Sequence, residues 1–378
     1  MKILVAADSF KDALPSLAVC RAIQRGIERA CPDAACTLFP MADGGEGTAD
    51  ILAWHLGGET IDRTVADPLG RPVTARYFFS EKNKVAFIEM AQASGLERLK
   101  PNERNPLMTN TYGTGELIAD ALKRGACNIL LGIGGSATND GGMGMAAALG
   151  WRFFSKKGEM LEPIGENLTI VETMVGPDWQ AVAPGVQVEV LCDVTNPLFG
   201  PDGAAQVFAR QKGADEAAVE QLDAGLRHFS TLLEGHFGKN LAHVPGAGAA
   251  GGMGAGAMAF LHAALRPGAD LVMELTGFEQ ALEKADLVIT GEGKLDGQTA
   301  HGKLIHRVCQ RAAGHSVPVI AFCGTLDAGP EVLEALGLRA AFSLLHRPMS
   351  LPEALASTAD GLALLAFNVL RLWAVKLS

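Results

Sequence analysis

Residues 1–12 read MKILVAADSFKD, and this stretch decides how the rest of the chain is interpreted. A short apolar run at 3–7 ends in polar residues, and a helical pattern follows at 17–30. A second apolar run at 36–41 ends in ADGGEG at 42–47, and a second helical pattern follows it. Short apolar runs that alternate with helical patterns are typical of a parallel α/β sheet. The first run is too short for a signal peptide and has no small-residue cleavage site after it, so we interpret it as a strand.

The same alternation returns near the end of the chain, with apolar runs at 286–290, 317–323 and 340–345. Together with the first two runs, these predict one doubly wound parallel sheet of five strands. If this sheet is flavodoxin-like, its strand order is 2-1-3-4-5. In such a sheet, ligands bind beyond the carboxyl ends of the strands at the point where the strand order reverses. That point would lie between the strands at 3–7 and 286–290.

The middle of the chain has a different pattern. Alternating segments at 73–79 and 85–90 flank the polar turn SEKNK, which indicates an antiparallel hairpin. Further apolar runs at 128–133 and 186–192 predict buried strands. We therefore expect a second α/β domain, containing a hairpin and a mixed sheet, at residues 60–275. It would interrupt a flavodoxin-like domain formed by residues 1–59 and 276–378.

Composition excludes several functional classes. The chain has 378 residues, and a formal net charge of −10 argues against nucleic acid or an anionic membrane as a partner. The seven cysteines form no CxxC pair, which is typical of a reduced, cytoplasmic protein. No histidine motif for zinc occurs, and no segment is apolar enough to span a bilayer, so we expect a soluble protein.

Three glycine-rich loops are candidates for binding a nucleotide. GIGGSA at 132–137 fits a dinucleotide fingerprint, but the acidic residue expected about 20 residues later is missing. The loop continues as TNDGG, whose donors suit phosphate groups without a dinucleotide. GAGAAG at 246–251 either binds a ligand or allows a close helix contact. GQTAHGKL at 297–304 is one residue short of a Walker A loop and lacks its Ser/Thr, although Lys303 could still reach a phosphate.

Four aspartates follow predicted strands beside Gly, Ser or Thr: Asp8, Asp43, Asp193 and Asp296. One such aspartate is usually a helix cap. Four of them from both domains, together with glycine loops and Lys11, fit phosphoryl transfer. In that reaction acidic side chains hold Mg²⁺ or accept a hydroxyl proton, and a lysine neutralises the transferring group.

Six motifs in order carry a resemblance over nearly the whole chain: ADSFK at 7–11, ADGGEGT at 42–48, GIGGSATNDGG at 132–142, CDVTNP at 192–197, PGAGAAGGMG at 245–254 and TGEGKLD at 290–296. Together they resemble the bacterial glycerate kinase family of the type-I class. The resemblance implies ATP and Mg²⁺ as cofactors, D-glycerate as substrate and phosphorylation of its 2-hydroxyl. The family often has Pro where this chain has Ala7, and Arg where it has Lys294, which gives a point charge in place of a bidentate fork.

On this basis we expect an active-site cleft between the two domains. The expected catalytic residues are Asp8, Lys11, Asp43, Asp193 and Asp296, with Asp43 and Asp193 as metal ligands. The expected nucleotide-binding residues are Gly134, Gly135, Ser136, Thr138, Asn139, Asp140, Gly248 and Glu292. The expected glycerate-binding residues are Ser9, Arg71, Lys294 and Lys303. The residues alone leave open which aspartate is the base, and they say nothing of the oligomeric state. Two alternatives are a nicotinamide-dependent 2-hydroxyacid oxidoreductase and a two-lobed small-molecule binding protein.

Overall fold

The computed structural model describes residues 1–297 and 304–374 and divides into two compact units. Unit 1 comprises Met1–His55 and Gly268–Ser378, and unit 2 comprises Leu56–Pro267. The domain boundaries expected from the sequence lie after residue 59 and before residue 276, four and eight residues later than these positions.

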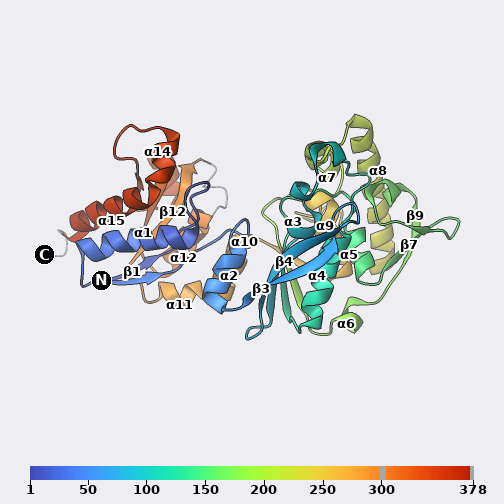
Figure 1. Cartoon of the computed structure of the whole chain (residues 1–378), viewed down its shortest axis with the longest axis horizontal. Coiled ribbons are helices and arrows are strands. Elements are labelled where there is room, and N and C mark those ends of the chain that lie inside the picture. Colours follow the sequence, from blue (N-terminus) through green and yellow to red (C-terminus); the bar gives the residue numbers. More distant parts are fainter. Residues whose placement is uncertain (298–303, 375–378) are drawn as a thin grey trace. The chain divides into compact units, whose positions relative to one another are not determined.

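Unit 1 is built on a five-stranded sheet in the order β14-β13-β12-β1-β2 (Figure 1). The strands are β1 (Lys2–Val5), β2 (Ala35–Leu38), β12 (Leu287–Asp296), β13 (Val319–Asp327) and β14 (Ala340–Ser343). All neighbouring pairs are parallel. Numbered along the chain, this is the order 2-1-3-4-5, so the predicted flavodoxin-like sheet is confirmed and its order reverses between β1 and β12.

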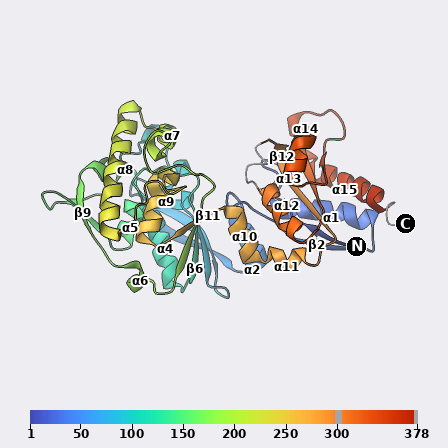
Figure 2. The same ribbon diagram turned by 180° about the vertical axis from the view of Figure 1, so that it is seen from behind.

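Helices cover both faces of this sheet. They are α1 (Ser16–Ala30), α2 (Thr48–Leu56), α10 (Gly268–Thr276), α11 (Phe278–Leu282), α12 (Leu304–Gly314), α13 (Pro330–Leu336), α14 (Leu351–Ala356) and α15 (Thr358–Ala374). Successive side chains of a strand point to opposite faces, so Ile3 and Val5 pack with α1 and α15, and Leu4 packs with α10, α11 and α12. Figures 1 and 2 show these two helical layers from opposite sides.

Strand β12 is longer than the sequence indicated, because it continues past residue 290 to Asp296. Its partner β13 is nine residues long, and the two pair as far as Asp296 and Asp327. A Cβ at Gly291 would lie 2.4 Å from the Phe322 carbonyl of β13, so only glycine fits at this position of the strand. The motif TGEGKLD is therefore part of a strand rather than a loop beyond it.

Unit 2 contains a six-stranded sheet in the order β11-β10-β6-β5-β4-β3. The strands are β3 (Glu59–Ala66), β4 (Pro72–Ser80), β5 (Val85–Glu89), β6 (Asn128–Gly132), β10 (Gln187–Leu191) and β11 (Ala264–Arg266). Strands β3, β4 and β5 pair antiparallel, whereas β5, β6, β10 and β11 run parallel, which confirms the expected hairpin and mixed sheet. A small sheet of β7 (Arg152–Ser155), β8 (Met160–Leu161) and β9 (Val171–Val175) accompanies it.

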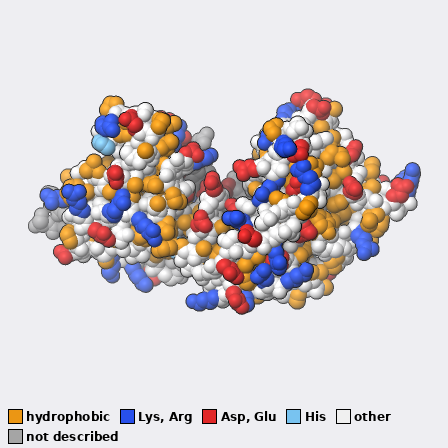
Figure 3. All heavy atoms as spheres, viewed as in Figure 1, with side chains coloured by type: hydrophobic (Ala, Val, Ile, Leu, Met, Phe, Trp, Pro, Cys, Tyr) orange, Lys and Arg blue, Asp and Glu red, His pale blue; other side chains and the backbone are white. Residues whose placement is uncertain are grey.

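The helices of unit 2 pack around a main apolar core and a smaller cluster of Ala205, Ala209, Val219 and Leu222. They are α3 (Ala91–Ser94), α4 (Tyr112–Lys123), α5 (Met143–Ala148), α6 (Trp179–Val182), α7 (Ala204–Phe208), α8 (Glu216–Phe237) and α9 (Ala249–Phe260). Short 3₁₀ turns lie at Leu96–Arg98, Pro101–Glu103, Gly165–Thr169 and Arg210–Lys212. Among the described residues, no helix has the length and apolarity needed to cross a membrane. Figure 3 shows acidic and basic side chains interspersed over the face of each unit that this view presents.

Candidate active site

Asp8 lies at the point where the strand order of unit 1 reverses. Its backbone N–H donates to the carbonyl of Gly291 at 2.9 Å, which continues the pairing of β1 with β12 beyond the end of β1. The N–H of Ser9 donates to Asp8 Oδ1 at 2.6 Å. Asp8 is not a helix cap, because α1 begins at Ser16 with Pro15 at its N-cap position. The backbone thus places the Asp8 carboxyl at the predicted ligand-binding edge.

Burial and two acidic neighbours change the proton affinity of Asp8. Its pKa rises from 3.8 to about 7, first because of burial and then because of the charges of Asp43 and Glu292. The hydrogen bonds from Ser9 act in the opposite direction without cancelling this rise. A carboxyl group that exchanges its proton near neutral pH is suited to accept a proton from a substrate hydroxyl.

A pocket of about 660 Å³ opens beside Asp8. Asp8, Ser9 and Lys11 line one part of it, and Glu46 and Trp54 line another. The segment that carries Lys11 is held in a tight turn, since Phe10 and Leu14 exchange two backbone hydrogen bonds of 2.8 and 2.9 Å. The pocket therefore combines a titratable carboxyl, an exposed lysine and an exposed aromatic ring.

Ser16 joins the ends of the two strands that form this pocket. Its hydroxyl donates to the carbonyl of Ala7 at 2.8 Å and accepts from the N–H of Met41 at 2.9 Å. Asp43 follows closely after Met41, and its Oδ1 accepts from the N–H of Gly45 at 2.9 Å. The buried side chain of Ser16 thereby fixes the loops that carry Asp8 and Asp43.

Lys294 and Asp296 lie on the extension of β12 and form an ion pair of 3.1 Å with each other. Lys294 also pairs with Asp327 at 3.3 Å, and these two partners raise the pKa of its ammonium group. The sequence predicts Lys294 as a glycerate-binding residue and Asp296 as a catalytic residue. The structure shows the two side chains paired with each other.

A second edge of interest lies in unit 2, where β5, β6, β10 and β11 present their carboxyl ends together. The glycine loop at 133–142 follows β6, and Asp193 follows the neighbouring strand β10. Gly134 and Gly135 are exposed, and a Cβ at Gly134 would meet no atom within 4 Å. A ligand can therefore approach the loop backbone on this side.

The inner part of the glycine loop is buried and polar. Asp140 accepts hydrogen bonds from the N–H groups of Thr111, Gly142 and Gly144 and from the Thr111 hydroxyl. Burial raises the pKa of Asp140, and these four donors counteract that rise. Since its carboxylate is occupied by the protein itself, Asp140 holds the loop in shape.

Two neighbours of Asp140 have no such partners. In the described part of the chain, nothing bonds to the hydroxyl of Thr138 or to either polar atom of the Asn139 amide, although all three atoms are buried. Buried polar groups are nearly always hydrogen-bonded, to protein or to ordered water. These atoms make the interior of the loop chemically suited to a polar ligand or to ordered water.

Sequence reasoning missed Lys212, which lies under the same loop. Its ammonium group donates to Ser136 Oγ at 2.8 Å and to the Thr138 carbonyl at 2.7 Å, and its exposed fraction is 1%. Burial lowers its pKa to about 7, and the charge of Asp140 opposes this change. Lys212 stands in the polar stretch ARQKGAD, which has the pattern of a solvated turn, so no signal in the sequence pointed to burial.

The dinucleotide interpretation of GIGGSA is not favoured. That fingerprint requires a helix to open within the glycine turn, but α5 begins only at Met143, after a loop of about ten residues. The glycines at 246–252 do not follow a strand either, and they serve close packing. A Cβ at Gly248 would lie 2.1 Å from the Pro197 carbonyl, and one at Gly251 would lie 2.1 Å from that of Thr138.

Arg71, an expected substrate-binding residue, lies in the turn between β3 and β4, at the same end of the unit 2 sheet as the carboxyl ends of β5 and β6. Arg71 is engaged by two carboxylates, Asp67 at 2.7 Å and Glu103 at 2.8 Å, and both raise the pKa of its guanidinium group. Lys303, with most of the Walker-like sequence, lies outside the described residues. Within the described ranges, no group of three or more His, Cys, Asp or Glu side chains is arranged to hold a metal ion.

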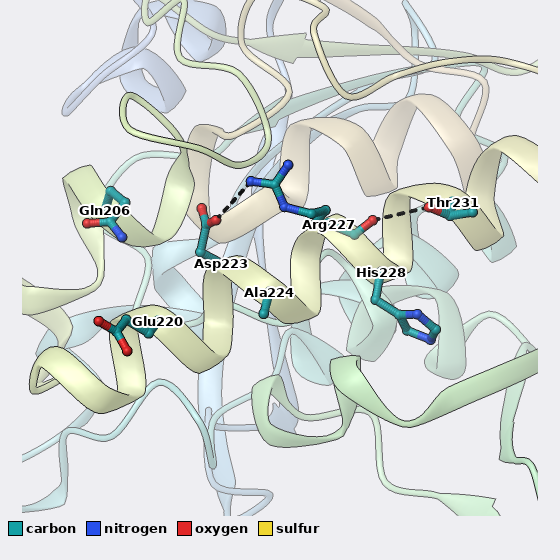
Figure 4. A pocket seen from close by; sticks show the side chains of 7 residues that line it. All are labelled: Gln206, Glu220, Asp223, Ala224, Arg227, His228 and Thr231. Carbon is teal, nitrogen blue, oxygen red and sulfur yellow. Dashed lines mark hydrogen bonds and ion pairs between the residues drawn. The ribbon is translucent and has the colours of Figure 1, made fainter.

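A shallow pocket of about 380 Å³ on α8 contains none of the predicted residues (Figure 4). Arg227 pairs there with Asp223 at 3.5 Å and lies 4.2 Å from the centre of the Phe199 ring. His228 shares a hydrogen bond of 2.7 Å with the Val171 carbonyl. These polar groups stabilise the surface of α8 and do not form a set of catalytic groups.

Comparison with known proteins gives one consistent family for the chain. The family model described as "Glycerate kinase family" matches residues 3–374. A glycerate kinase from Halalkalibacterium halodurans is 49% identical, and the match covers 93% of each chain. A glycerate 2-kinase from Escherichia coli K12 is 41% identical over 98% of this chain and 97% of its own. A crystal structure named as a glycerate kinase 2 from Salmonella typhimurium LT2 superposes with a TM-score of 0.90 at 41% identity and covers 100% of this chain and 99% of its own. The chain therefore belongs to the glycerate kinase family.

Proposed function

We propose that this protein transfers the γ-phosphoryl group of ATP to the 2-hydroxyl of D-glycerate, with Mg²⁺ as cofactor. Membership of the family supports the reaction, and the relative named glycerate 2-kinase supports the choice of hydroxyl. The observation that carries the proposal is the site around Asp8. There a carboxyl group with a pKa of about 7 lines a pocket with Lys11 at the edge where such a sheet binds ligands.

Asp8 is the proposed general base. A hydroxyl group becomes a better nucleophile as its proton is withdrawn, and a base with a pKa near the working pH is the most effective for this task. Asp8 is partly buried, which strengthens its interactions with charged groups near it. Lys11 is the proposed cation for the transferring phosphoryl group or the glycerate carboxylate, because it is exposed and lines the same pocket.

The donor set fits a magnesium ion without a cage of protein ligands. Mg²⁺ is usually held by one or two carboxylates together with phosphate oxygens and water. Asp43 and Glu292 would supply such carboxylates in unit 1, since both act electrostatically on Asp8. Asp193 is the corresponding candidate in unit 2. Bound Mg²⁺ would neutralise the charge that develops on the phosphates.

The glycine loop at 134–140 is the proposed site for the phosphates of ATP. Exposed backbone at Gly134 and Gly135 gives access, and the buried polar atoms of Thr138 and Asn139 lack protein partners among the described residues. Successive backbone N–H groups in a glycine loop are a common cradle for phosphate oxygens. Asp140 holds this loop in shape by accepting four hydrogen bonds. Gly248 allows the glycine segment at 246–252 to pack closely against Pro197. All seven cysteines are free, which agrees with a reducing, cytoplasmic setting.

A coupled assay of ADP release tests this function. We expect ADP to form only when D-glycerate, ATP and Mg²⁺ are present together, and chelation of Mg²⁺ to abolish it. An equivalent assay with NAD(H) in place of ATP, followed by its nicotinamide absorbance, is expected to show no change. ADP release that does not depend on glycerate would contradict the proposal.

A further inference from the structure

The ammonium group of Lys212 connects two points of the glycine loop. It bonds to the Ser136 side chain and to the backbone carbonyl of Thr138, two residues further on. Gly213, which follows it, has a φ of +98°, and a Cβ there would lie 2.2 Å from the Arg104 carbonyl. The backbone at Lys212 therefore has little freedom to move. The lysine side chain reaches the glycine loop from this rigid position.

Within the described residues, no carboxylate lies within 4.0 Å of this ammonium group. Asp140 acts on it through space, but its oxygens are occupied by four donors from Thr111, Gly142 and Gly144. A buried cation without a direct counter-ion is costly, and it is retained where the site needs a positive charge. A bound phosphate at the loop would supply the missing negative charge.

From this geometry, and resting on the proposed function, we propose that Lys212 is a positioning residue for the nucleotide. It holds residues 136–138 in the conformation that presents the loop to the phosphates of ATP, and its charge favours their binding. It acts through Ser136 and Thr138, since the side chain is buried beneath them.

The test replaces the amine while keeping the length of the side chain, in Lys212→Met. We expect the KM for Mg·ATP to rise by about tenfold or more, as for the loss of a hydrogen bond to a charged group. The KM for D-glycerate should stay within about twofold, because that change does not touch its pocket. Lys157→Met is the matched control, since Lys157 is an exposed lysine in the same unit, on the turn between β7 and β8.

A purely structural role gives a different result. A variant that is only less stable would lose maximal rate in proportion to its folded fraction, and its KM for Mg·ATP would not change. That outcome would overturn the inference.

Ser136→Ala provides a milder second variant should Lys212→Met not fold. It removes one of the two acceptors and leaves the buried amine in place, and we expect the KM for Mg·ATP to rise by about fivefold. In the Lys212→Met background, Ser136→Ala should have little further effect, because both changes remove the same contact. An unchanged KM in Ser136→Ala, or full additivity of the two changes, would contradict a role through this contact.

Calorimetric binding of Mg·ADP separates this inference from the proposed function. Wild-type protein that binds no Mg·ADP would overturn both. Wild type and Lys212→Met that bind Mg·ADP equally well would overturn the role of Lys212 alone and leave the kinase proposal standing.

Discussion

Replacing Asp8 with asparagine should lower activity and raise stability at the same time. In the folded protein the pKa of Asp8 is about 7, compared with 3.8 for the free group. At about 1.4 kcal/mol per pKa unit, the ionised carboxylate destabilises the fold by up to about 4 kcal/mol. The Asp8→Asn substitution removes this cost and keeps a side-chain oxygen that can accept the Ser9 N–H.

The stability difference between Asp8→Asn and wild type depends on pH, and the raised pKa of Asp8 fixes its direction. Between pH 3.8 and about 7, folded protein keeps the Asp8 proton that unfolded chains have lost, so wild-type stability falls as the pH rises. Above about pH 7 both states are ionised and the cost stays constant. The gain in stability of Asp8→Asn over wild type should therefore grow by about 2 to 3 kcal/mol between about pH 5 and about pH 8.

Two measurements check this prediction. Urea unfolding in EDTA at these two pH values gives the stability difference, and the coupled ADP-release assay gives activity. The loss of a general base should lower kcat/KM by about a hundredfold or more, which corresponds to about 2.7 kcal/mol. A variant that is less stable than wild type at the higher pH, or that keeps activity within about tenfold, would refute the reasoning.

Three further substitutions and one ligand test have different expected outcomes. Lys11→Met should lower kcat/KM by about a hundredfold with little change in melting temperature, since the lysine is exposed; a large fall in melting temperature would show a structural role instead. Asp140→Ala should destabilise the protein by about 3 kcal/mol or more in urea unfolding, because it leaves four buried donors unsatisfied, and an unchanged midpoint would contradict this role of the carboxylate. Arg71→Met should leave the KM for glycerate within about twofold, because its guanidinium group is already paired with Asp67 and Glu103. A larger rise in this KM would show that Arg71 binds glycerate. Mg·ATP, but not NAD(H), should raise the melting temperature of wild type, and a shift with NAD(H) alone would contradict the kinase proposal.

The sheet of unit 1 could be predicted because its central strands β1, β12 and β13 are largely buried and so appear as continuous apolar runs. The alternation of these runs with helical patterns indicated a doubly wound parallel sheet, and the order around β1 and β12 followed from interpreting that sheet as flavodoxin-like. The extension of β12 could not be predicted in this way. Glu292 and Lys294 are polar, and only the pairing with β13 as far as Asp296 makes that segment a strand.

Some residues of the candidate site could likewise be predicted from the sequence, and others could not. Asp8 and the glycine loop follow apolar strands, so their places at sheet edges follow from topology. Lys212 does not, because a lysine in a polar turn gives the same pattern whether it is exposed or buried. Its burial depends on contacts with Ser136 and Thr138, which lie 76 and 74 residues away in the sequence. Similarly, the partners of Arg71 are set by tertiary packing, and composition alone gives no indication that its charge is already paired.

The most direct test of the proposed reaction is the ³¹P NMR spectrum of the product, recorded without proton decoupling. Protein is incubated with D-glycerate, ATP and Mg²⁺ until ADP accumulates. Transfer to the 2-hydroxyl places phosphorus next to a single methine proton and gives a doublet, with one equivalent of ADP per phosphoester formed. A triplet, which comes from phosphorus beside the two methylene protons of a 3-phosphate, would contradict the assignment of the 2-hydroxyl. The absence of any new phosphoester signal while ADP accumulates would contradict glycerate as the acceptor.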